Sequence, residues 1–119
     1  MNSDWFETLC DDRIEKCLTV LELKSNEYSK DYDRLHNFKV AKNLGVYKTN
    51  EQALWGMFIK HLVCLKDACD NPEIATEKFI DEKITDSINY LLLLEGLLVE
   101  STEKNLVPYP LSEEDITGD

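Results

Sequence analysis

Acidic side chains on three predicted helices are the residues of this 119-residue chain best suited to chemistry. Glu27 lies near the end of the first helix, Asp67 lies late in the third, and Glu82 and Asp86 lie one turn apart early in the fourth. Short connections favour antiparallel neighbours, which would bring these acids together at one end of a bundle. Carboxylate oxygens suit Mg²⁺, which can bridge phosphates and orient a water for attack on phosphorus. We therefore predict that Glu27, Asp67, Glu82 and Asp86 hold Mg²⁺, although each acid taken singly is more typical of a solvated helix surface.

Basic, amide and aromatic side chains accompany these acids. Lys24 lies on the first predicted helix and Lys60 on the third, and both would meet a phosphate. Lys60, Glu82 and Asp86 form the predicted catalytic set. Tyr90 could stack on a base or simply fill space. The residues predicted to contact the substrate are Lys24, Asp33, Arg34, His36, Asn37, Asn89 and Tyr90.

The fourth predicted helix carries two stripes of residues on opposite sides. One stripe is apolar, whereas the other begins with carboxylates and ends in leucine, which indicates that this second side is covered as well. Carboxylates at the edge of a covered groove usually pair with a base or hold a metal, because burying bare charge is costly. The apolar stripe is Ile80, Ile84, Ile88 and Leu91, and the mixed stripe is Glu82, Asp86, Asn89 and Leu93.

Apolar spacing predicts four helices and no strand. A short lead precedes the first helix, and His61 falls in an apolar band of the third, which is typical of a satisfied core residue. The helices are expected at about 11–29, 34–43 and 50–70, and from 72 or 76 to 101.

Local signals set the ends of these helices. Gly45 ends the second, and Thr49 with Gln52 forms a capping box before the third. The sequence thus indicates one all-α domain over 1–105, followed by an acidic tail over 106–119 that is extended or disordered.

Charge and cysteine usage exclude several function classes. Twenty-four acidic against thirteen basic residues give a net charge of −11, so the general surface should not bind bare nucleic acid. The acidity instead suits solubility, divalent cations or mimicry of nucleic acid toward a basic partner. No CxxC pair, signal-peptide pattern or run of apolar residues long enough for a bilayer is present, so we expect a reduced, cytoplasmic protein without membrane contact.

Three segments of the chain resemble a group of small phage and prophage proteins. Together they cover about residues 24–95. They are Asn26-Glu27-Tyr28 with 33–39, Gln52–Met57 with Lys60-His61 and Asp67, and Glu82-Lys83-Ile84 with Asp86 and 88–91.

That group is similar in turn to the all-α nucleoside triphosphate pyrophosphatases of the MazG and dimeric dUTPase type. The resemblance implies a MazG-like four-helix bundle, dimeric or tetrameric, that holds Mg²⁺ through an ExxE and an ExxD element and splits a nucleoside triphosphate to monophosphate and pyrophosphate. Glu82 and Asp86 correspond best to ExxD, although they stand four apart. The ExxE element has no counterpart, since the third helix offers Lys60, Cys64 and Asp67.

These observations leave more than one function open. The first is a Mg²⁺-dependent nucleotide pyrophosphohydrolase, or a phage protein that binds a nucleotide or small phosphorylated ligand without cleaving it. The alternative is a non-catalytic acidic phage protein in the host cytoplasm that inhibits a host factor such as a defence nuclease. The apolar residues of 91–99 also predict a homodimer or tetramer, because one protomer would not cover them all.

Overall fold

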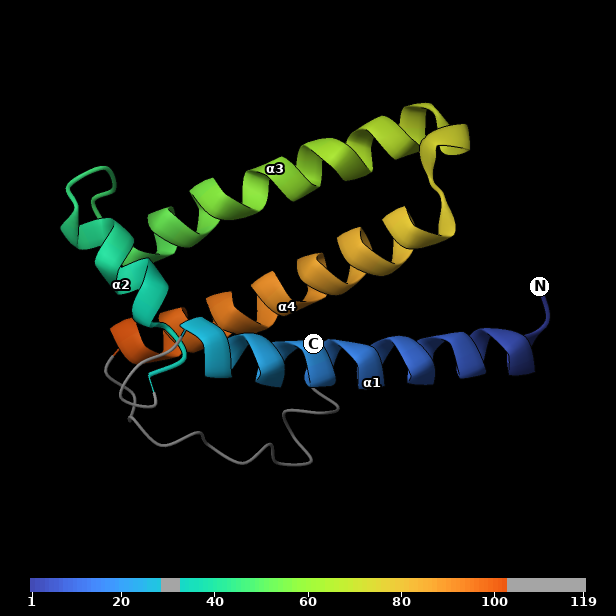
Figure 1. Cartoon of the computed structure of the whole chain (residues 1–119), viewed down its shortest axis with the longest axis horizontal. Coiled ribbons are helices and arrows are strands. Elements are labelled where there is room, and N and C mark those ends of the chain that lie inside the picture. The colour runs from blue at the N-terminus through green and yellow to red at the C-terminus, as the bar shows by residue number, and fades with distance from the viewer. Residues whose placement is uncertain (29–32, 103–119) are drawn as a thin grey trace.

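The computed structural model describes residues 1–28 and 33–102, with side chains described for 1–24 and 33–102. Within these ranges it contains helices and no strand, which confirms the predicted all-α class. The predicted tail at 106–119 lies outside the described residues. The helices are α1 (Ser3–Tyr28), α2 (His36–Asn43), α3 (Asn50–Asp70) and α4 (Glu77–Ser101), with a 3₁₀ turn, η1 (Pro72–Ile74), between the last two (Figure 1).

Helix α1 begins about two turns earlier than predicted, at Ser3. The backbone amide of Trp5 donates to the side-chain oxygen of Asn2 at 2.8 Å, so Asn2 caps the first turn. The apolar spacing did not predict this start, because Trp5 and Phe6 do not belong to a buried stripe. Both side chains are 54% exposed on the helix surface.

Side-chain caps fix the starts of α3 and α4. The backbone amide of Gln52 donates to Thr49 Oγ1 at 3.1 Å, which confirms the predicted N-cap of α3. The amide of Phe79 donates to Thr76 Oγ1 at 3.1 Å, so Thr76 is the N-cap of α4. Of the two starts predicted for the last helix, the later one is therefore correct.

Helix α4 is the central helix of the fold. It packs against α3 and α1, and α2 packs against α3. Helix α3 runs antiparallel to α4, whereas α1 runs parallel to it (Figure 1). The prediction that short connections favour antiparallel neighbours holds for α3 and α4. The long helices α1, α3 and α4 alternate in direction along the chain, so α1 and α4 point the same way. The last turns of α1 and α3 consequently lie at opposite ends of the fold.

The mixed stripe of α4 faces the interior, as its leucine had indicated. Asn89 is 6% exposed, and Leu97, which continues that side, is 1% exposed. Leu97 belongs to a core that α2, α3 and α4 build together. The buried members of this core are Phe38, Ala53, Leu54, Phe58 and Leu97.

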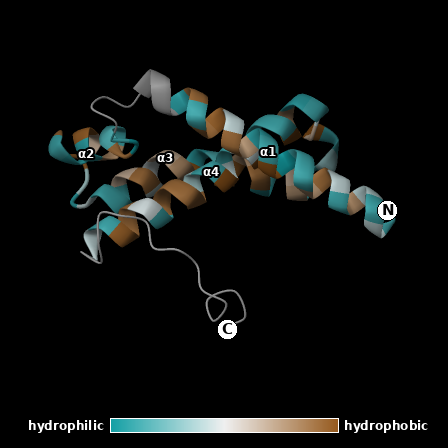
Figure 2. Cartoon of the chain, turned by 90° about the horizontal axis from the view of Figure 1, so that it is seen from below, coloured by the Kyte–Doolittle hydropathy of each residue, from teal (hydrophilic) through white to brown (hydrophobic). Residues whose placement is uncertain are grey.

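The apolar stripe of α4 was predicted to be covered, but only its middle is: Ile84 and Ile88 are half-buried, and the two ends of the stripe face outward. Ile80 is 44% exposed and Leu91 is 56% exposed, and apolar residues recur along both α3 and α4 (Figure 2). In the part of the chain that the structure describes, no helix has the length and apolarity needed to cross a bilayer. The outward stripe, with Ile80 and Leu91 at its exposed ends, is therefore an apolar surface of a folded helix that residues 1–28 and 33–102 leave partly uncovered.

Hydrogen bonds hold α1 in register against α4. Arg13 Nη1 donates to Asp81 Oδ1 and to Thr85 Oγ1, both at 2.7 Å, and Asn89 Nδ2 donates to the Cys17 carbonyl at 3.0 Å. Thr85, Asn89 and Cys17 are all buried. These contacts place the C-terminal half of α1 beside the middle of α4, where a cavity opens.

Candidate functional site

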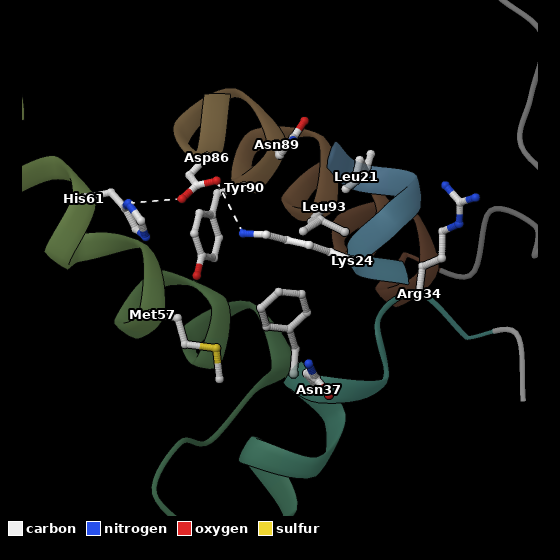
Figure 3. A pocket seen from close by; sticks show the side chains of 11 residues that line it. Leu21, Lys24, Arg34, Asn37, Met57, His61, Asp86, Asn89, Tyr90 and Leu93 are labelled. Atoms are coloured by element: carbon white, nitrogen blue, oxygen red, sulfur yellow. Dashed lines mark hydrogen bonds and ion pairs between the residues drawn. The ribbon is translucent and has the colours of Figure 1, made fainter. Parts of the chain in front are cut away.

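A cavity of about 300 Å³ opens where α1, α3 and α4 meet the start of α2. It is the size of a small-molecule site, at the lower end of the usual range. Aliphatic, aromatic, amide and charged side chains all contribute to its wall (Figure 3). The lining residues are Leu21, Lys24, Arg34, Asn37, Phe38, Met57, His61, Asp86, Asn89, Tyr90 and Leu93.

Asp86 occupies the centre of the polar wall. Lys24 Nζ of α1 lies 3.4 Å from Asp86 Oδ1, and His61 Nδ1 of α3 lies 3.9 Å from Asp86 Oδ2. Figure 3 shows the carboxylate between these two side chains. The Asp86 side chain is 15% exposed, so its charge is partly desolvated and is balanced mainly by Lys24.

His61 is a pocket residue and not the satisfied core residue that the sequence indicated. Its Nδ1 is buried and has no hydrogen-bond partner among the described residues, because the 3.9 Å to Asp86 exceeds hydrogen-bond distance. Burial lowers the pKa of His61, and the nearby Asp86 charge opposes this only in part. The imidazole is therefore neutral near pH 7.

Aromatic rings line the cavity next to these polar groups. Tyr90 stacks on Phe58 with centroids 5.1 Å apart and an interplanar angle of 14°, and its centroid lies 5.2 Å from that of His61. Phe38 of α2, itself part of the core, also lines the cavity. Burial raises the pKa of Tyr90, and the Asp86 charge adds to this, so the phenol stays protonated. The wall thus offers flat apolar surfaces beside a charged pair.

Amide groups and a second cation complete the lining. Asn89 donates through Nδ2 to the Cys17 carbonyl, while its Oδ1 is buried without a hydrogen-bond partner in the described residues. Arg34 and Asn37 are exposed and stand at the rim. Arg34, Asn37, Asn89 and Lys24 were all predicted to contact a substrate, and the structure brings them to one cavity.

Two other predicted substrate contacts lie outside this lining. Asp33 accepts from Lys39 Nζ at 2.8 Å and from the Leu35 amide at 3.0 Å, next to the start of α2. Burial would raise the Asp33 pKa, but these hydrogen bonds outweigh it and hold the pKa below its usual range. His36 begins α2 and is half-buried there. Asp33 therefore organises the entry into α2, beside the pocket.

The acids predicted to hold Mg²⁺ are not assembled as a set. Only Asp86 lines the cavity, while Glu82 and Asp67 are exposed on α4 and α3, and the side chain of Glu27 lies outside the described residues. Among the described residues, no three His, Cys, Asp or Glu side chains are close enough to hold one ion. Lys60, from the predicted catalytic set, is exposed and away from the cavity lining. The described donors thus do not fit a carboxylate cage for Mg²⁺.

Comparison of the chain with protein-family models, with curated proteins and with solved structures finds no match.

Several pocket residues were missed at the level of sequence. From spacing, Leu21, Met57 and Leu93 are ordinary apolar helix positions. Phe38 was noted only as the residue that follows Asn37. His61 gave a signal, since a histidine within an apolar band must leave at least one ring nitrogen in need of a partner. Its proximity to Asp86 depends on the packing of α3 against α4, which sequence spacing does not reveal.

Proposed function

We propose that the cavity binds a nucleotide. The observation that carries this proposal is the gathering of Lys24 and Arg34 around an aromatic-lined pocket in a chain whose net charge is −11. Against these two cations the lining holds one carboxylate, Asp86, so the pocket is positive within an acidic protein. A phosphate-bearing ligand is favoured by that charge, and a planar ring is favoured by the Phe38 and Tyr90 surfaces.

The arrangement suggests how such a ligand is held. Stacking of a base on an aromatic side chain contributes about 1–3 kcal/mol and tolerates different bases. Arg34 stands at the exposed rim, where its guanidinium can form paired hydrogen bonds with phosphate oxygens. The base then lies inside and the phosphate at the mouth of the cavity.

Thermal unfolding with nucleoside mono- and triphosphates tests the proposal, each with Mg²⁺ and with a chelator. A ligand at 100 times its dissociation constant adds about 2.7 kcal/mol of stability, which raises the melting temperature by several degrees. Tyr90→Leu should abolish the rise, whereas Lys66→Met, at an exposed lysine that pairs with Asp70, should leave it intact. An unchanged melting temperature with every nucleotide would refute the proposal.

Cleavage of the nucleotide is the catalytic form of the same proposal. It is supported by the resemblance to the MazG-type pyrophosphatases and by the position of Asp86 in the pocket. Release of pyrophosphate from a nucleoside triphosphate in Mg²⁺, lost in Asp86→Ala, is the expected result for an enzyme. Binding without release would identify a nucleotide receptor instead.

The outward stripe of α4 supports an oligomer of this MazG-like bundle. Ile80, Leu91 and Leu98 are each exposed by more than two-fifths, and Trp55 of α3 is 51% exposed. Monomeric proteins rarely leave contiguous apolar faces of this kind uncovered, so the stripe suits a second copy of the chain. A host protein bound at this face is the alternative, and light scattering of the purified chain separates the two, because only self-association doubles the mass.

A further inference from the structure

Asp86 has hydrogen-bonding capacity that the described residues leave unused. An ionised carboxylate has two oxygens with about four acceptor sites. Its described neighbours are Lys24 Nζ at 3.4 Å and His61 Nδ1 at 3.9 Å, both longer than the roughly 2.7–2.9 Å of a charge-assisted hydrogen bond. A partly buried acceptor without close donors costs stability unless a ligand supplies them. The carboxylate is thus placed to receive N–H groups from a bound molecule.

The Lys24–Asp86 pair presents a definite order of groups along the pocket wall. The ammonium is a donor, and the two carboxylate oxygens beside it are acceptors. We infer that this pair reads the base of the nucleotide and selects guanine, an inference that rests on the proposed function. Guanine offers the complementary order on one edge, with the O6 acceptor followed by the N1–H and N2–H donors.

The other bases complement this pair less well. Adenine and cytosine offer one amino donor beside a ring-nitrogen acceptor, so they engage Lys24 and a single Asp86 oxygen. Uracil and thymine place one N–H between two carbonyl oxygens. With one carbonyl at Lys24, the other would face a carboxylate oxygen of Asp86, which is repulsive. Sites built to hydrogen-bond a ligand reject analogues that leave a buried polar group unpaired. The expected order of affinity is therefore guanine first, adenine and cytosine next, and uracil or thymine last.

The other lining residues are also suited to a base that lies against the Lys24–Asp86 pair. Tyr90 lies beside the charged pair (Figure 3), and Phe38 also lines the cavity. Asn89 Oδ1 adds a second buried acceptor that has no partner among the described residues. Arg34 lies apart from the Lys24–Asp86 pair, beyond Leu21, which leaves it for the phosphate.

Calorimetry on the whole chain tests the inference with GMP, AMP, CMP, UMP and inosine monophosphate. Inosine monophosphate differs from GMP only by lacking the amino group on C2, so it measures one hydrogen bond to Asp86. We expect it to bind roughly tenfold or more weakly than GMP, and UMP more weakly still. This comparison uses the unaltered protein, so it does not depend on a variant that folds.

A substitution at Asp86 gives a second readout that a structural role would not produce. In Asp86→Asn one acceptor becomes a donor, which complements xanthine, where a carbonyl replaces the amino group of guanine. We expect preference to reverse, with xanthosine monophosphate bound more tightly than GMP by roughly tenfold. Asp70→Asn, the same change at an exposed end of α3, should keep the preference for GMP.

The outcomes separate this inference from the proposed function. Equal affinity for GMP, inosine monophosphate and UMP would overturn the guanine assignment while leaving nucleotide binding in place. A folded Asp86→Asn protein that still prefers GMP to xanthosine monophosphate would also overturn the assignment. Failure of all five monophosphates to bind the unaltered chain would overturn the proposed function and the inference together.

Discussion

Lys24 and Asp86 are 62 residues apart in sequence, yet Lys24 Nζ lies 3.4 Å from Asp86 Oδ1 in the wall of the cavity. The pair joins the C-terminal part of α1 to the polar side of α4. Both residues were singled out from sequence, Lys24 for phosphate and Asp86 for metal. Their contact shows that Lys24 balances the charge of Asp86, so a ligand need not bring a cation to this carboxylate.

Replacing Lys24 should weaken ligand binding without unfolding the protein. In Lys24→Met we expect the affinity for GMP to fall roughly tenfold or more, because a charge-assisted hydrogen bond contributes about 1.5–3 kcal/mol. The Lys24 side chain is 49% exposed, so its ion pair adds no more than about 1 kcal/mol to folding stability. Calorimetry measures the first effect and urea unfolding the second, with Lys66→Met as the control. Full affinity in Lys24→Met would remove this lysine from the site.

His61 should make stability depend on pH in a defined window. Its folded pKa is lowered by burial, so the unfolded state binds more protons than the folded state between the two pKa values. The stability from neutral His61 is therefore complete above the unfolded value of about 6.5, and is lost as pH falls toward the folded value.

Urea unfolding of wild type and His61→Asn at closely spaced pH values measures this contribution. Asparagine does not titrate, so the difference in unfolding free energy between the two proteins should shrink as pH falls through that window. The many carboxylates that also titrate in acid cancel in the difference. A difference that stays constant from neutral pH downward would contradict the assigned direction of the pKa.

Gly56 should not tolerate a side chain, because Tyr47 packs directly against it. A Cβ at this position would overlap the Tyr47 hydroxyl and lie 2.7 Å from its ring carbon Cε1. Overpacking costs about 1–3 kcal/mol, while alanine regains up to about 1 kcal/mol of helix propensity. We expect Gly56→Ala to lower the unfolding free energy by roughly 1 kcal/mol, as measured in urea.

A second glycine supplies the matched control. A Cβ at Gly96 would meet only Leu35 methyl groups at 3.6 Å or more, which is ordinary contact. Gly96→Ala should therefore stabilise α4 by about 0.5–1 kcal/mol. In a Tyr47→Ala background the Gly56→Ala cost should vanish, and a cost that persists there would place the strain elsewhere.

The outward stripe of α4 should control self-association. Leu91→Glu would place a charge on an apolar face, and in a symmetric dimer two such charges would meet. We expect the dimer dissociation constant to rise at least about tenfold, since burying one leucine contributes about 1.5–3 kcal/mol. Light scattering over a concentration series measures this, and Val46→Gln, at an exposed loop position, should associate like wild type. A wild-type chain that stays monomeric at all concentrations would exclude the dimer.

Much of the local structure follows from the sequence alone. Thr49 and Gln52 form the predicted N-cap of α3, and Gly45 ends α2 with a φ of 87° that suits glycine. Both stripes of α4 were predicted to be covered. This is confirmed for the mixed stripe, with Asn89 buried, and was wrong for the ends of the apolar stripe, where Ile80 and Leu91 are exposed. Helix caps and apolar periodicity involve residues about one to four positions apart, so they can be predicted without knowledge of the fold.

The sites where helices meet depend on long-range packing. Four acids predicted to meet include Glu27 and Asp67, whose helix turns lie at opposite ends of the fold, because α1 runs parallel to α4 and α3 runs antiparallel to it. Nothing in the spacing indicates that Asp86 faces Lys24 and His61.

By itself, then, the sequence determined the all-α class and where most of the helices begin and end, since each depends on neighbours along the chain. Only the tertiary structure decided that a cation of α1 and a histidine of α3 flank one acid of α4. That outcome depends on the direction and register of whole helices, which are set by the combined packing of residues such as Leu54, Phe58 and Leu97 and by the Arg13 hydrogen bonds.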